Sequence, residues 1–189
     1  MEFETRTITL RDGVRVTLRS GGAADAQADL EFLRRAVPDS PYILTIPEEI
    51  LGVEEIRARL IDLLEGGGLF MIVTPDATPG VIVGVLDIRR SKRLKQAHVA
   101  GLGMMIEPAW RGRGLGRAMM EGAIAWATAN PDIERLELGV FAQNPDALRL
   151  YESCGFVREG LKPDAARQAS GESLDEVIMA RRVKPSAAC

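Results

Sequence analysis

The residues best suited to chemistry form one short turn, Arg111-Gly112-Arg113-Gly114-Leu115-Gly116-Arg117, between an apolar run and a helical pattern. The first N–H groups of a helix have no partners within the helix, and the helix dipole places partial positive charge at that end. Glycines let anion oxygens approach the backbone without an intervening Cβ, and the arginines add fixed positive charge. The segment therefore predicts a binding site for a phosphate or diphosphate group.

Two common phosphate-binding loops fit this turn poorly. A Walker loop ends in Gly-Lys followed by Ser or Thr, and no such ending follows these glycines. A dinucleotide fingerprint requires a third glycine where this chain has Arg117, within a βαβ unit near an early strand. A tight strand-to-helix turn that uses glycine for geometry alone is the alternative interpretation.

The turn resembles the acetyl-CoA site of the GNAT N-acetyltransferase superfamily, whose signature is Arg/Gln-x-x-Gly-x-Gly/Ala and is matched by residues 111–116. A second segment, residues 144–156, is similar to the superfamily pattern Asn-x-x-Ala-x-x-Leu-Tyr-x-x-x-Gly-Phe at every key position. Residues 171–179 look like the last strands of the branch that acetylates free amino acids and related small amines. Ser173 stands there in place of an aromatic residue that is common in that branch.

The resemblance implies an enzyme that moves an acetyl group from acetyl-CoA to a primary amine of a small molecule. It implies direct attack by the amine in a ternary complex, with acetyl-CoA as co-substrate and no metal. The acceptor is expected to be an amino acid or a similar amine. The alternatives are a protein N-terminal or lysine acetyltransferase, a non-catalytic acyl-CoA-binding sensor, and a nucleotide-binding regulatory domain.

On the co-substrate side, the resemblance implies that backbone groups of Met104, Met105 and Ile106 bind the pantetheine arm, which lies like an added strand. Asn144 is a helix N-cap by its sequence context, and the superfamily pattern adds a contact to acetyl-CoA. Tyr151 corresponds to the superfamily tyrosine that protonates the departing thiolate. A thiol and a phenol have pKa values close enough for this transfer, although a packed tyrosine would have the same pattern.

The proton acceptor for the amine is not identified by the sequence. Some superfamily members use a glutamate on the strand before Asn144, but the matching position here is Gly139. Glu137 would point to the same side of that strand, because side chains alternate along a strand. His98 is the only histidine and could act directly or through water, although a lone histidine at a strand start is more often structural.

The loop from Asp39 to Glu49 is the best candidate for acceptor binding, because the superfamily shapes its acceptor pocket between the first two helices. Glu48 and Glu49 could pair with a cationic amine, and Tyr42 could form a wall. The sequence Pro47-Glu48-Glu49 is also a common start of a helix, where the dipole favours acidic side chains.

Strands and helices must hold these residues in place. The periodicity of apolar residues and the turn signals between them predict where these elements lie. We expect an α/β (α+β) fold: one GNAT-like domain over residues 1–189, with a mixed, mostly antiparallel sheet of six to seven strands flanked by about four helices. The expected strands are 7–10, 14–19, 69–74, 81–88, 98–106, 136–141, 156–158 and 174–181. The expected helices are 24–36, 54–64, one from Leu115 to just before Asn130, and one from Asn144 to Gly155.

Composition narrows the class of protein. The chain has 189 residues, 46% of them hydrophobic and 27% charged, and a net charge of −3, which does not favour nucleic-acid binding. The basic run from Arg89 to Lys95 is expected to be a solvated hairpin turn. Cys154 and Cys189 provide no disulfide framework, and no apolar run approaches the roughly 20 residues of a membrane span. We therefore expect a soluble, cytoplasmic protein. Homodimers are common in the superfamily that the sequence resembles, but no exposed apolar stripe in the sequence demands one, so the oligomeric state stays open.

Overall fold

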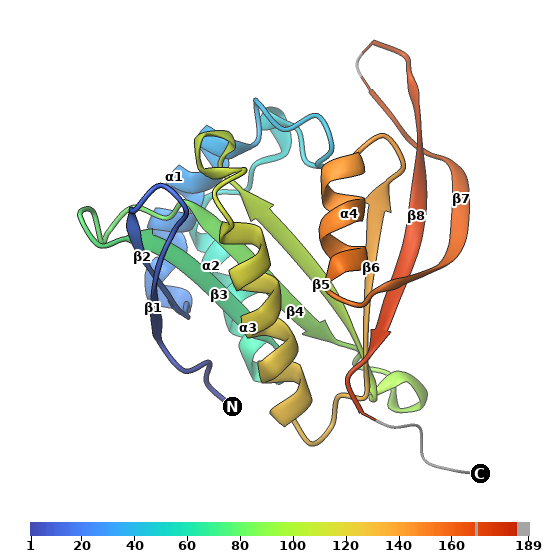
Figure 1. The fold of residues 1–189 in the computed structure, drawn as a ribbon, viewed down its shortest axis with the longest axis horizontal. Helices are drawn as coiled ribbons and strands as arrows, with labels where there is room; N and C mark the ends of the chain where they lie inside the picture. Colours follow the sequence, from blue (N-terminus) through green and yellow to red (C-terminus); the bar gives the residue numbers. More distant parts are fainter. Residues whose placement is uncertain (169, 185–189) are drawn as a thin grey trace.

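In the computed structural model, which describes residues 1–168 and 170–184, strands from both ends of the chain form one mixed sheet (Figure 1). Its order is β1-β2-β3-β4-β5-β6-β8-β7, and every neighbouring pair is antiparallel except β5 and β6. The strands are β1 (Arg6–Thr9), β2 (Arg15–Ser20), β3 (Leu69–Pro75), β4 (Gly84–Arg90), β5 (Val99–Ile106), β6 (Arg135–Phe141), β7 (Val157–Arg167) and β8 (Ser173–Arg182).

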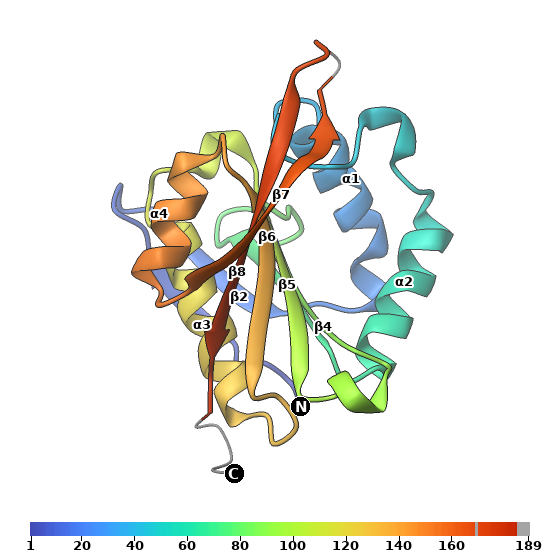
Figure 2. The ribbon, with the colours of Figure 1, turned by 90° about the vertical axis from the view of Figure 1, so that its right-hand side faces the viewer.

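Helices cover both faces of this sheet. Helices α1 (Ala26–Ala36) and α2 (Val53–Glu65) lie against one face, and α3 (Leu115–Ala129) and α4 (Pro145–Ser153) lie against the other (Figure 2). The predicted fold class is confirmed, with the expected number of α-helices in the described part of the chain. All eight expected strand segments join the sheet, which therefore has one strand more than the six to seven expected of it.

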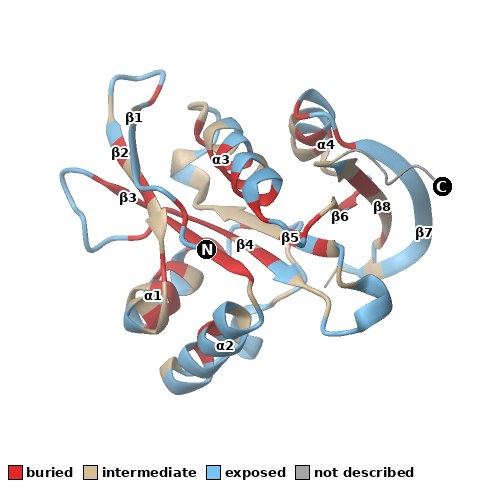
Figure 3. Ribbon diagram, turned by 90° about the horizontal axis from the view of Figure 1, so that it is seen from below, coloured by how far each residue is buried: buried red, intermediate tan, exposed pale blue. Residues whose placement is uncertain are grey.

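Alternation along the strands divides the core into two parts. On β5, Ala100 and Leu102 belong to the cluster beneath α3 and α4, whereas Met105 packs against the cluster beneath α1 and α2. The buried sides of the helices face the sheet and their outer sides are exposed (Figure 3). Burial of one large aliphatic side chain stabilises a fold by roughly 1.5–3 kcal/mol, so the two clusters fix the strands between the helix pairs.

Strands β5 and β6 are joined at one end only. Their Cα partners run from Val99↔Arg135 to Gly101↔Glu137, and no later pair is formed among the described residues. Beyond that point β5 follows β4 as far as Ile106, and β6 follows β8 as far as Phe141. The two strands diverge from their shared end (Figure 1). We call this opening, between residues 102–106 and 138–141, the β5–β6 fork.

Most predicted element boundaries lie within a few residues of the observed ones, but two strands differ. The expected strand at 81–88 begins instead at Gly84, although the Val83 amide still donates to the Val73 carbonyl and the Val83 carbonyl accepts from the Glu107 amide. Strand β7 extends to Arg167, far beyond the expected 156–158, and is exposed along nearly its whole length. The sequence of β7 lacks the apolar alternation of a half-buried strand, so its full length could not be predicted. Its pairing with β8 identifies it as a strand.

The expectation of a solvated hairpin turn holds for only part of the basic run. Residues 91–95 lie in the connection between the antiparallel strands β4 and β5, whereas Arg89 and Arg90 are the last residues of β4 and pair with β5. Cys154 is a free, buried cysteine, whereas Cys189 lies outside the described residues. Among the helices of the described part, none combines the length and apolar character needed to cross a membrane.

One buried charge interrupts the core beneath α1. Asp29 is 1% exposed, and neither carboxylate oxygen has a hydrogen-bond partner among the described residues. Burial raises the pKa of Asp29 from 3.8 to about 6; the nearby charge of Arg59 opposes this shift, and the charges of Asp87 and Asp25 add to it. The ionised form is therefore disfavoured in the folded state.

We predict that Asp29→Asn stabilises the protein at neutral pH. Because the folded-state pKa is raised, the folded protein holds its proton longer than the unfolded chain, and stability falls as pH rises from about 4 to about 6. The variant should gain on the order of 1–3 kcal/mol at pH 7.5 and almost nothing at pH 4. Urea unfolding at both pH values measures this difference, and an equal effect at the two would contradict the assignment.

Candidate active site

The predicted anion site lies at the start of α3, directly after the end of β5 (Figure 1). Gly112 has φ 73° and Gly114 has φ 93°, in the left-handed region that favours glycine. Backbone amides from Gly112 to Arg117 donate no hydrogen bond to any described residue, and the first helical bond starts at Ala118. These N–H groups are therefore available to an anion at the N-terminus of α3, where the helix dipole adds partial positive charge.

Gly112 and Gly116 have different roles in this turn. A Cβ at Gly112 would meet nothing within 4 Å, so the backbone there is open to a ligand. A Cβ at Gly116 would lie 3.0 Å from Leu150 Cδ2 and 3.4 Å from Ile106 Cδ1. Gly116 therefore allows α3 to approach α4 and the end of β5, which is a packing role that the sequence pattern did not separate from anion binding.

The arginines of the turn each have a protein partner. Arg111 donates from Nε to the Ile106 carbonyl (2.9 Å) and from Nη2 to Ser40 Oγ (2.6 Å). Arg113 pairs with Asp12 at 2.8 Å and stacks over the Trp110 ring, with its Cζ 5.0 Å from the centroid.

Arg117 donates to Ser153 Oγ at 2.8 Å and lies 3.7 Å from Glu121. Arg111 thus fastens the loop between α1 and α2 to the end of β5, and Arg117 fastens α3 to α4. The free main-chain amides, rather than unpaired guanidinium groups, are the unsatisfied donors of the turn.

The second motif forms α4, which begins after β6 as α3 begins after β5. Asn144 is the predicted N-cap, because its Oδ1 accepts a hydrogen bond from the Ala147 amide at 3.2 Å. Tyr151 lies two turns further along α4, 7% exposed, with its ring 6.1 Å from that of Phe156. Burial, with the nearby Cys154, raises the pKa of Tyr151 to about 12, so the phenol keeps its proton at neutral pH.

Met104, Met105 and Ile106 lie on β5 inside the β5–β6 fork. Their neighbour on one side is β4, where Met104 pairs with Leu86 and Met105 with Val85. No strand of the described chain pairs with their other side. The Ile106 carbonyl already accepts from Arg111 Nε. Because backbone polar groups need partners, the remaining groups of this edge can bind an extended ligand.

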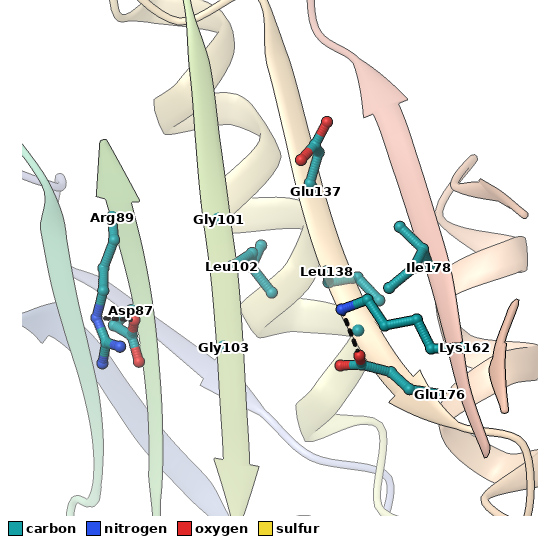
Figure 4. A pocket seen from close by; sticks show the side chains of 11 residues that line it. Asp87, Arg89, Gly101, Leu102, Gly103, Glu137, Leu138, Lys162, Glu176 and Ile178 are labelled. Carbon is teal, nitrogen blue, oxygen red and sulfur yellow. Dashed lines mark hydrogen bonds and ion pairs between the residues drawn. The ribbon is translucent and has the colours of Figure 1, made fainter. Parts of the chain in front are cut away.

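A cavity of about 460 Å³ lies where the fork begins (Figure 4). We call it the trough; its lining is Asp87, Arg89, Gly101, Leu102, Gly103, Glu137, Leu138, Gly139, Lys162, Glu176 and Ile178. Gly101 and Gly103 alternate with the buried Ala100 and Leu102, so the trough opens on the face that carries α1 and α2. Together with Gly139, these glycines form the floor of the trough, and they place no side chain in it.

Charged pairs form the walls of the trough (Figure 4). On β4, Asp87 lies 3.0 Å from Arg89. On the opposite wall, Lys162 Nζ donates to Glu176 at 2.8 Å. Glu137 accepts from Arg135 Nε at 2.7 Å, next to the last β5–β6 pair.

The structure brings only some of the predicted site residues together. The glycine turn, residues 104–106, Asn144 and Tyr151 lie on the elements around the fork, and Glu137 lines the trough. His98 immediately precedes β5, roughly 26 Å from Ile106 at 3.3 Å per residue, at the opposite end of the strand.

The predicted acceptor residues lie on the surface. Tyr42 is 36% exposed, and Glu48 and Glu49 belong to an exposed 3-10 helix, η2 (Pro47–Glu49). Glu49 Oε2 accepts from the Ile46 amide at 3.4 Å, so it caps η2 as the alternative interpretation of this sequence expected. The bond between Arg111 and Ser40 keeps the loop beside the glycine turn.

Apart from Glu137, sequence reasoning missed the charged groups on the walls of the trough. Asp87 and Arg89 alternate with the buried Leu86 and Ile88, which is a signal that a polar face was present on that strand. Glu176 and Lys162 come from strands whose pairing with the fork is not local in sequence. Among the described residues, no cluster of metal-ligating side chains was found.

Solved structures of other proteins have a similar fold. An acetyltransferase of the GNAT family from Streptococcus pneumoniae superposes with a TM-score of 0.82 and 26% identity, over 88% of this chain and 99% of that one. A GNAT superfamily phosphinothricin acetyltransferase from Sinorhizobium meliloti, in complex with acetyl-CoA, superposes with a TM-score of 0.78 and 21% identity. That match covers 93% of this chain and 89% of the other.

Sequence comparison agrees with the structural one. The L-amino acid N-acetyltransferase AaaT of Escherichia coli (strain K12) is 34% identical over 102 residues, which are 54% of this chain and 62% of that protein. The alignment thus spans less than two thirds of that relative. The family model described as "Acetyltransferase (GNAT) family" matches residues 32–156, which include the fork, the glycine turn and α4. This chain belongs to the GNAT acetyltransferase family.

Proposed function

We propose that the protein transfers an acetyl group from acetyl-CoA to the primary amine of a small molecule, with an amino acid or a similar amine as acceptor. Acetyl-CoA supplies an activated acetyl thioester. The observation that carries this proposal is the continuity between the free amides of residues 112–117 and the free edge of β5. The amides can bind an anionic group, and the edge of β5 that leads from them to the trough can bind an extended chain.

The diphosphate fits the glycine turn because anions bind free N–H groups at helix N-termini. An extended arm of the same molecule would then lie along Met104 to Ile106, as an added strand hydrogen-bonded to the unpaired edge. Backbone N–H groups on that edge can also stabilise negative charge that develops on a reacting carbonyl oxygen. The acetyl group would thereby reach the floor of the trough.

Tyr151 is the proton donor in this proposal. Its ring is held by packing on α4, and its raised pKa keeps the hydroxyl protonated over the whole physiological range. A thiolate that leaves in this apolar setting needs a proton, and the phenol supplies it.

The proposed acceptor class rests on two supports. A relative with 34% identity over 54% of this chain is an L-amino acid N-acetyltransferase. The trough also presents carboxylates together with Arg89 and Lys162, and these can receive the ammonium and the carboxylate of one amino acid.

The first prediction from the proposed function concerns the binding site of the diphosphate. Gly112→Asp places a carboxylate at the open turn, and Asp tolerates the left-handed backbone there, so repulsion should weaken acetyl-CoA binding by about tenfold or more. Isothermal titration with acetyl-CoA measures it. The matched control, Gly112→Asn, has the same size and backbone strain without the charge and should bind severalfold more tightly than the aspartate variant. Equal affinity for the two variants would refute this placement of the diphosphate.

The second prediction concerns the proton donor. Tyr151→Phe keeps the ring and its packing against Phe156 but removes the hydroxyl, so thiol release should fall by about 100-fold. Acetyl-CoA affinity and thermal stability should stay close to those of the wild type. A variant that releases thiol at the wild-type rate would exclude Tyr151 as the donor.

The third prediction concerns the acceptor. Thiol release is measured with each L-amino acid, with polyamines, and with peptides that carry a free N-terminus or a lysine. We expect the highest kcat/KM with an L-amino acid. Turnover with peptides alone would identify a protein acetyltransferase, and acetyl-CoA binding without turnover on any amine would identify a sensor.

A further inference from the structure

The floor of the trough lacks side chains where the reaction needs a proton acceptor, and neighbouring strands fill that space with carboxylates. A Cβ at Gly103 would lie 3.0 Å from Asp87 Oδ1, and a Cβ at Gly139 would collide with the Glu176 carboxylate. Each carboxylate therefore lies over a glycine of the adjacent strand. Asp87 reaches over β5 from β4, and Glu176 reaches over β6 from β8.

Hydrogen bonding distinguishes the three carboxylates of the trough. Glu137 accepts from Arg135 through Oε1, and Glu176 accepts from Lys162 through Oε2, so each of these glutamates has one oxygen in a hydrogen bond. Asp87 lies within 3.0 Å of Arg89 through Oδ2, but it accepts no hydrogen bond from any described residue. Its other oxygen, Oδ1, is the one that lies over Gly103.

The position of Gly103 makes this free oxygen significant. Gly103 lies two residues past the last β5–β6 pair and directly before Met104, so it is inside the fork and beside the proposed acetyl position. Asp87 is partly accessible, with 22% of its side chain exposed, so a ligand in the trough can touch it. The three atoms nearest to a Cβ at Gly103 all belong to Asp87, whereas Glu176 lies over Gly139, so Asp87 is the carboxylate that lies beside Met104.

We propose that Asp87 accepts the proton of the acceptor amine, an inference that rests on the proposed function. The bound ammonium gives one proton to Asp87 Oδ1, which leaves a neutral amine and a neutral carboxyl group. The nitrogen lone pair then forms the bond to the acetyl carbon while the carbon–sulfur bond breaks. As the amide forms, the nitrogen loses its second proton to water. The thiolate takes a proton from Tyr151, and both side chains return to their starting states by exchange with solvent.

The surroundings of Asp87 favour this role. Burial raises the pKa of the Asp87 carboxyl, although the charges of Arg89 and Arg59 lower it, and a higher pKa makes a carboxylate a better proton acceptor for an amine. The charged groups that face it are Arg89 on its own strand, Arg59 on α2, Asp29 on α1, and, across the floor, Glu137, Lys162 and Glu176.

The test compares Asp87→Asn with the wild type, using the L-amino acid that the wild type acetylates fastest. The amide keeps the shape of the side chain but cannot take the proton, so kcat/KM at pH 7 should fall by about 100-fold. The loss should shrink by about tenfold per pH unit as pH rises toward the pKa of the amine, because the free amine then needs no acceptor. Acetyl-CoA affinity should not change.

Controls separate this role from a structural one. Asp76→Asn removes a carboxylate paired with Arg15 at 3.2 Å outside the trough and should leave kcat/KM within twofold of the wild type. If Asp87→Asn fails to fold, Asp87→Glu keeps the carboxylate and should retain the wild-type pH profile at a lower kcat. A loss in Asp87→Asn that is constant with pH, or a pH-dependent loss in Glu137→Gln or Glu176→Gln instead, overturns the inference.

Failure of the proposed function would look different. In that case the wild type would bind acetyl-CoA but release no thiol with any amine, and both proposals would fall together. Wild-type turnover combined with an unimpaired Asp87→Asn variant would remove only the role of Asp87.

Discussion

The loss of pairing between β5 and β6 after Gly101 is the constraint on which the rest of the site depends. A parallel pair normally continues for the length of its strands, because each unpaired N–H or carbonyl group in a sheet interior loses a hydrogen bond. Here the two strands remain attached to opposite halves of the sheet, β5 to β4 and β6 to β8. The fork therefore exposes a polar edge in the middle of the fold rather than at its margin.

The fork also determines where the helices begin. Because α3 follows β5 and α4 follows β6, both helix N-termini lie at the end where the strands diverge. Gly116 lets the helices close over this opening, since a side chain there would contact Leu150 and Ile106. One backbone feature thus gathers the free amides of residues 112–117, a free strand edge and Tyr151 around a single opening.

The sequence predicted the parts of this arrangement that are encoded locally. The turn at residues 111–117 and the Asn144 cap depend on residues three or four apart, so their patterns are visible in one window. The trough could not be predicted in this way, because Asp87, Gly103, Gly139 and Glu176 meet only through strand pairing. For the same reason the glycine at position 139 indicated a missing glutamate, although Glu176 covers that position from β8.

The charge pattern of the trough bears on what it can select. Asp87 lies beside Arg89, Glu176 beside Lys162 and Glu137 beside Arg135, so each carboxylate of the trough has a cation next to it. A polyamine carries only positive charge, so its other amines would be repelled by Arg89 and Lys162. A zwitterion can place its ammonium beside a carboxylate and its own carboxylate beside Arg89 or Lys162, so both of its charges meet groups of opposite sign. Within the proposed function, this charge pattern favours an acceptor that bears both charges over one that bears a single sign.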